Sequence, residues 1–139
     1  MTYELCMPSK EQVILAIQMG LTTYKSNEPI KHVYIATDFD NETQWLHLHR
    51  HLPPGMTLIT SSITIHPDYS FTRHVGPLPH FMIDLHIMSQ ANVFIGNCIS
   101  SFSAFVSRYR VFNLHFDQTT HFFAYQKPLT VSKYRHDEL

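Results

Sequence analysis

Cysteine is scarce in this 139-residue chain, and neither sign of charge is in excess. The only cysteines, Cys6 and Cys98, lie far apart, so the chain has neither a C-x-x-C pair nor the spacing of a zinc site. Ten basic and eleven acidic residues give a net charge of −1, which argues against a nucleic-acid-binding protein. No apolar run reaches the roughly 18 residues of a membrane span, so we expect none.

We expect no secretory leader within these residues, because residues 1–4 (MTYE) contain neither a basic segment nor an apolar one. The chain nevertheless ends in an endoplasmic-reticulum retrieval signal, formed by His136, Asp137, Glu138 and Leu139. A protein must enter the endoplasmic reticulum before a receptor retrieves it. We therefore expect this chain to be the C-terminal part, or a truncated form, of a longer protein of the endoplasmic-reticulum lumen.

One further triplet agrees with a lumenal location. Asn41, Glu42 and Thr43 form an N-glycosylation sequence, although such triplets also occur by chance. The overall composition, with 44% hydrophobic and 15% charged residues, is typical of a globular protein. We expect one domain of common size.

Segments with helical spacing alternate with short apolar segments that are typical of strands. We predict helices over residues 9–21, 41–51, 81–90 and 100–110, and strands over residues 32–37, 56–60 and 93–95. Residues 61–79 read as one long irregular loop, and the tail as irregular structure. This order predicts an α/β fold, a Rossmann-like parallel sheet with flanking helices. We divide it into a nucleotide-binding part over residues 1–110 and an extension over residues 111–139.

The most informative stretch, residues 93–110, reads VFIGNCISSFSAFVSRYR. It predicts a buried strand, a small polar turn and a helix that begins near Ser100 and Ser101. Such a turn directs backbone N–H groups and a partial positive charge at a ligand above the sheet, often a phosphate. An ordinary capped helix after a strand explains the same pattern. Arg108 and Arg110 lie in the later turns, where a cation suits the helix dipole.

Three other candidate sites are weaker. His47 and His51 are one helical turn apart, on either side of His49, but no further zinc ligand is evident. Cys98 is a nucleophile only if a base lies beside it, and a buried thiol is the simpler interpretation. Asp38 ends a predicted strand, where it serves either a site or the cap of the next helix.

Three segments together resemble one family. VYIATD at residues 33–38, IDLHIMSQANVFIGNCISSFSAFVSRYR at residues 83–110 and the terminal HDEL are similar to the C-terminal half of the GDP-fucose protein O-fucosyltransferases. The nearest branch acts on EGF-like repeats, as in Notch receptors. The resemblance covers residues 1 to about 110 and the terminal tetrapeptide. Residues 56–82 and 111–135 depart from the family pattern.

The resemblance implies the C-terminal lobe of a GT-B glycosyltransferase, which binds GDP-fucose and transfers fucose to a Ser or Thr hydroxyl without a metal. It also implies roles for individual residues. Asp84 matches a carboxylate that contacts the nucleotide, although a solvated helix residue is the simpler reading. Ser100, Ser101 and Phe102 match a triplet beside the donor diphosphate, while burial in the core is the commoner fate of a Phe.

The family's H-x-R motif followed by Gly, whose arginine is thought to stabilise the departing GDP, has no match here. His49 and Arg50 stand in another context, on a predicted helix. The family cysteines that pair with the counterparts of Cys6 and Cys98 lie upstream, so the resemblance implies that both are unpaired here. We therefore expect either the donor-binding part of a fucosyltransferase, inactive alone, or a non-catalytic nucleotide- or partner-binding module derived from it.

Overall fold

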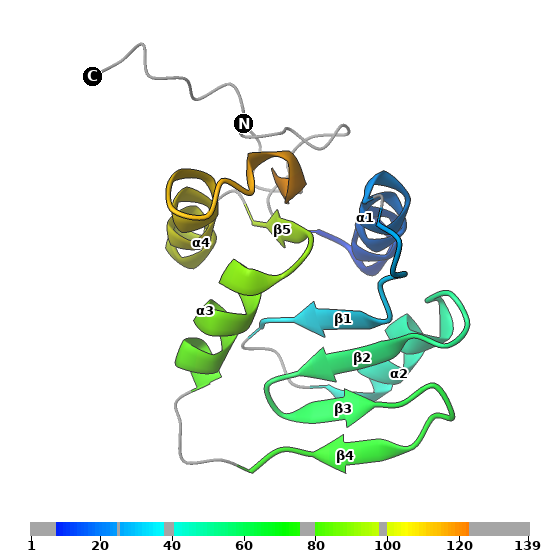
Figure 1. Ribbon diagram of the computed structural model, residues 1–139. Coiled ribbons are helices and arrows are strands. Elements are labelled where there is room, and N and C mark those ends of the chain that lie inside the picture. Colours follow the sequence, from blue (N-terminus) through cyan, green and yellow to red (C-terminus); the bar gives the residue numbers. More distant parts are fainter. Residues whose placement is uncertain (1–7, 25, 38–40, 76–79, 98–99, 123–139) are drawn as a thin grey trace.

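The computed structural model describes residues 8–24, 26–37, 41–75, 80–97 and 100–122. Its elements (Figure 1) are α1 (Lys10–Thr23), β1 (His32–Ile35), α2 (Glu42–Arg50), β2 (Thr57–Thr60), β3 (Ile63–Ile65), β4 (Phe71–Arg73), α3 (His80–Gln90), β5 (Phe94–Gly96), α4 (Ser101–Phe112), the 3-10 turn η2 (Asp117–Thr119) and β6 (Thr120–Phe122). This is an α/β fold. The four predicted helices and the three predicted strands are confirmed; β1 ends two residues earlier than expected, β2 begins one residue later, and β5 is shifted by one residue.

The sheet is mixed, and the prediction of a purely parallel sheet is wrong. Strands β1, β2, β3 and β4 lie in that order. The β1–β2 pair is parallel, while β2–β3 and β3–β4 are antiparallel. Strands β5 and β6 form a separate parallel pair. Figure 1 shows β5 above β1, with α1 on one side and α3 on the other.

The stretch expected as a long loop contains β3 and β4. The β2–β3 turn closes on Thr60, whose Oγ1 accepts the backbone N–H groups of Ser62 and Ile63 at 3.2 and 3.0 Å. At the next turn Asp68 accepts the N–H and the hydroxyl of Ser70. The prediction of one continuous loop is therefore wrong: turn residues alternate with two three-residue strands, each interrupted by a threonine and so without a continuous apolar run.

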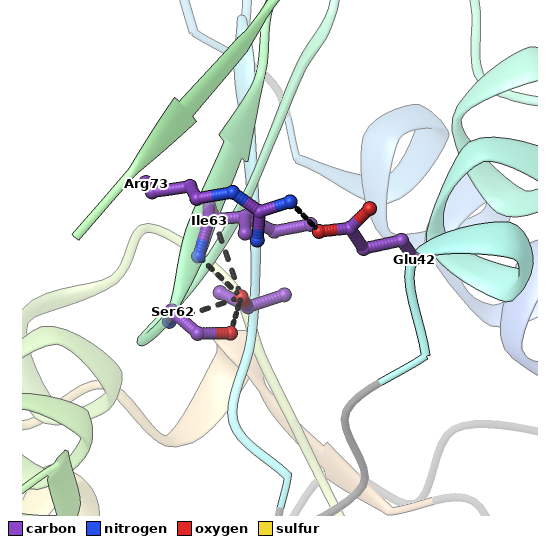
Figure 2. Close-up of polar contacts among 5 residues, drawn as sticks. Glu42, Ser62, Ile63 and Arg73 are labelled. Carbon is purple, nitrogen blue, oxygen red and sulfur yellow. Dashed lines mark hydrogen bonds and ion pairs between the residues drawn. The ribbon is translucent and has the colours of Figure 1, made fainter.

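An ion pair links the new hairpin to a helix. Figure 2 shows Arg73 of β4 reaching the carboxylate of Glu42, at the start of α2. Both side chains are largely exposed, so the pair contributes about 0–1 kcal/mol. It follows that the hairpin depends mainly on the burial of its apolar side chains.

Those side chains belong to one core between α2 and the mixed sheet. It contains Trp45, Leu48, Leu52, Met56, Leu58, Ile63 and Ile65, with the apolar face of α1 packed against it. Leu58 and Ile65, which face each other across β2 and β3, are 0% exposed. This core fixes β1, and therefore the strand from which Tyr34 projects.

The helix starts follow their sequence signals. Ser9 and Gln12 form a capping box at the start of α1, the spacing that such a box requires. Asn41 is the N-cap of α2, and its side chain accepts the Gln44 N–H at 3.2 Å. Glycosylation of Asn41 remains a prediction. No helix in the described part of the chain is long and apolar enough to cross a bilayer.

The region after α4 differs from the irregular structure that we expected. Thr120–Phe122 forms β6, which pairs with β5 in the register Phe94↔Thr120. Phe94 and Thr120 are almost fully buried. The short segment Thr120–Phe122 has no continuous apolar run to mark it as a strand, and its pairing with β5 reveals it. The retrieval signal, His136 to Leu139, lies outside the described residues.

Candidate functional site

The candidate site involves α3 and the start of α4. Residues 91–93 join the end of α3 to the start of β5, and β5 then leads to the start of α4. Helix α4 therefore begins just after the carboxyl end of β5, where ligands of α/β folds gather. Helices α3 and α4 pack against each other. Asp84 lies in the middle of α3, and Ser100 caps the start of α4.

Asp84 is half-buried and hydrogen-bonded, which excludes the reading of a fully solvated helix residue. Its Oδ1 accepts the hydroxyl proton of Tyr34 in β1, at 2.5 Å. This distance is typical of an O–H group donating to a carboxylate. Burial, followed by the neighbouring carboxylate, raises the pKa of Tyr34. Tyr34 therefore stays protonated and remains a donor at every physiological pH.

The start of α4 is built as the sequence predicts. Ser100 is the N-cap, and its side chain accepts the Ser103 N–H at 3.2 Å. Ser103 in turn accepts the backbone N–H of Asn97 through its hydroxyl, at 3.0 Å. Since Ser100 accepts at its oxygen, its hydroxyl proton is available for an anion. Ser101, the first residue of the helix, is exposed.

Phe102 is half-buried, which agrees with either a ligand contact or partial packing. Cys98 and Asp38 lie outside the described residues. Their candidate roles remain predictions.

The rings of His49 and His51 contact backbone carbonyls, and the rings of His47 and His51 lie 4.5 Å apart. His49 is buried, and its Nε2 lies 3.0 Å from the carbonyl of Met56. The Nδ1 of His51 lies 2.8 Å from the carbonyl of His47. Within the described residues no three His, Cys, Asp or Glu side chains gather as a metal would require.

An apolar cavity of about 310 Å³ adjoins the site. Strand β1 lines one side and β5 the other, with α1 and α3 closing it. Its lining includes Val33, Tyr34, Ile87 and Ile95. The cavity lies between the four-stranded sheet, through β1, and the β5–β6 pair, through β5. Contacts between these two sheets therefore help to set the position of α3 relative to β1.

Sequence reasoning missed two residues that hold the site. Tyr34 is one, and a tyrosine in a predicted buried strand was a signal that its hydroxyl needs a partner. Arg110 is the other. It was expected at the dipole of its own helix, but it is 0% exposed and donates to the carbonyls of Met88, Ser89 and Ala91 at the end of α3. Arg110 thereby fixes α3 against α4.

Comparison with known proteins identifies one family. A family model described as GDP-fucose protein O-fucosyltransferase matches residues 1–113, which includes all four helices. No solved structure gives a significant match to the chain. Because the family model covers most of the sequence, the chain belongs to the GDP-fucose protein O-fucosyltransferase family.

Proposed function

We propose that this chain is the donor-binding part of a protein O-fucosyltransferase of the branch that modifies EGF-like repeats, corresponding to part of the C-terminal lobe of a GT-B enzyme. Membership of the family implies GDP-fucose as the donor. The acceptor is a Ser or Thr hydroxyl of an EGF-like repeat, as in Notch-type receptors. The branch is inferred from the three segments that carry the resemblance: residues 33–38, residues 83–110 and the terminal HDEL.

One observation carries the proposal: Asp84 and the Ser100 cap lie on two helices that pack against each other, Asp84 in the middle of α3 and Ser100 at the start of α4. The carboxylate of Asp84 suits guanine, because its oxygens accept both N1–H and the 2-amino group, and adenine has no such pair of donors. The start of α4, with Ser100 and Ser101, suits the diphosphate. Base and diphosphate then bind to different helices.

The same chain lacks the arginine that the family uses on the departing GDP, since no H-x-R-x-G segment occurs in it. We therefore expect it to bind GDP-fucose but not to transfer fucose alone. Such an arginine acts by matching negative charge that grows in the transition state. The absence of this residue also favours the second candidate function, a non-catalytic nucleotide- or partner-binding module derived from the enzyme.

The terminal tetrapeptide places the protein, in this proposal, in the lumen of the endoplasmic reticulum, held there by the retrieval receptor. Fluorescence microscopy of the full-length protein, with and without residues 136–139 (HDEL), tests this location. Secretion of the shortened form supports it, and unchanged distribution contradicts it.

Calorimetric titration with GDP and ADP tests the donor site. We expect GDP to bind more tightly, and Asp84→Asn to weaken GDP binding by about tenfold or more, since it removes a charged hydrogen-bond acceptor. Asp68→Asn is the matched control, because Asp68 lies in the β3–β4 turn and keeps an oxygen for Ser70. Equal affinities for GDP and ADP would refute the role of Asp84.

A transfer assay separates the two candidate functions. Radiolabelled GDP-fucose and a folded EGF-like repeat are incubated with the chain. Incorporation above the enzyme-free blank would contradict the inactivity that we propose. GDP binding without transfer agrees with a donor-binding part, whereas no nucleotide binding leaves a partner-binding module.

A further inference from the structure

We propose that Tyr34 is a positioning residue for guanine recognition, which it controls by fixing the plane of the Asp84 carboxylate. The inference rests on the proposed function, since it requires Asp84 to bind the base. It adds a residue on a different strand, 50 positions away in the sequence.

The argument begins with the freedom of an aspartate side chain. The torsion that turns the carboxylate plane of Asp has broad minima, so rotamer preference alone leaves this plane loosely defined. The Tyr34 hydroxyl removes that freedom by donating to Oδ1 of Asp84 at 2.5 Å. A bond this short to a charged acceptor is among the stronger hydrogen bonds in proteins.

Tyr34 is itself well anchored. It lies within β1, opposite Ile59 of the parallel strand β2, and its ring forms part of the cavity wall beside Ile87 of α3. Tyr34 also remains protonated, for the reasons given above. The donor therefore has a fixed position, and Asp84 receives a fixed orientation from it.

The orientation of the Asp84 carboxylate matters most for a ligand that donates two hydrogen bonds to it. Guanine presents N1–H and the 2-amino group as parallel donors, so both bonds form only when the carboxylate lies in the plane of the base. Oδ1 accepts the Tyr34 proton and still has a second lone pair, and Oδ2 is not needed by Tyr34. A single bond, by contrast, tolerates rotation of the carboxylate.

The chain and its Tyr34→Phe variant are titrated with GDP and with IDP, whose hypoxanthine keeps N1–H and lacks the 2-amino group. In the native chain we expect GDP to bind about 10- to 100-fold more tightly than IDP, the effect of one charged hydrogen bond. In Tyr34→Phe the GDP/IDP affinity ratio should fall at least about threefold. A carboxylate that is free to rotate weakens the pair of hydrogen bonds to guanine more than the single hydrogen bond to hypoxanthine.

Tyr24→Phe is the matched control. Tyr24 is also half-buried, and its hydroxyl accepts the Asn92 amide at 2.9 Å, at the amino end of β5. This variant should keep the native ratio. Thermal melting of each variant shows whether it is folded.

The possible outcomes distinguish a failure of the Tyr34 inference from a failure of the proposed donor-binding function. A purely structural role for Tyr34 would weaken GDP and IDP binding by the same factor, leave the ratio unchanged, and overturn the inference. Equal affinities of the native chain for GDP and IDP would refute guanine recognition by Asp84, and the inference with it. A chain that binds neither nucleotide would refute the donor site itself.

Discussion

Replacing Arg110 by Met should destabilise the fold far more than the loss of a favourable interaction with the helix dipole alone, the role expected of it from the sequence, would do. Arg110 is 0% exposed, and the only ion pair among the described residues joins Arg73 to Glu42. Burial lowers the pKa of Arg110 to about 10, so the guanidinium is still charged at pH 7. The charge is balanced by carbonyl oxygens at the end of α3, where the helix dipole is negative.

The hydrogen bonds of Arg110 set the magnitude. Its Nη1 donates to the carbonyls of Met88, Ser89 and Ala91 at 3.1, 3.0 and 2.6 Å, and its Nε donates to the hydroxyl of Thr120 at 3.0 Å. Each buried acceptor left without a donor costs about 1–3 kcal/mol. Some of these carbonyls are only partly buried and regain water. We therefore expect a net loss of about 3–5 kcal/mol, as for other broken buried charge networks.

Two aromatic rings add to this network. The guanidinium carbon lies 5.1 Å from the ring centre of Phe116 and 5.8 Å from that of Phe94, within the range of cation–π attraction. A Met side chain keeps the packing against both rings but not the charge. Arg110→Met therefore tests the polar contacts rather than the volume.

Urea unfolding followed by circular dichroism measures the effect. A loss of 3–5 kcal/mol lowers the urea midpoint by about 1.5–2.5 M, for a slope near 2 kcal/mol per M. Arg108→Met is the matched control, because Arg108 is exposed on the same helix and should change stability by less than about 0.5 kcal/mol. Equal effects of the two substitutions would refute the reasoning.

Three further predictions concern the site, pH and the core. Changing both Ser100 and Ser101 to Ala should weaken GDP binding about 5- to 150-fold by calorimetry and leave guanosine binding unchanged; equal loss for both ligands would mean that the serines only support the helix. Burial, then the charge of Arg110, lowers the pKa of His121, so the folded state holds fewer protons than the unfolded state and stability falls as the pH drops below about 6.5. In His121→Gln the urea midpoint should change less between pH 7 and pH 5 than in the native chain, and an equal change in both proteins would contradict this. Leu58→Ala, at a site that is 0% exposed, should cost about 2–5 kcal/mol in the same unfolding assay, whereas Leu15→Ala, at an exposed position on α1, should cost far less.

The sequence by itself determined the elements whose signals are local. The capping box of Ser9 and Gln12 depends on residues three positions apart, and the start of α4 at Ser100 depends on one turn of helix. Helical spacing and apolar runs are also short-range, so α1 to α4 and β1, β2 and β5 were predicted. The family followed from the same segments, because it is a property of the sequence.

Only the tertiary structure decided the contacts between distant segments. Strands β3, β4 and β6 are short and each contains a threonine, so no continuous apolar run marks them as residues 93–95 mark β5. They exist because a neighbouring strand completes their hydrogen bonds. The Tyr34–Asp84 bond joins residues 50 positions apart. Arg110 looked like a cation at the end of its own helix, but the packing of α3 against α4 buries it. The partners of Tyr34 and Arg110 depend on which helices and strands pack against each other, and no local sequence pattern specifies this packing.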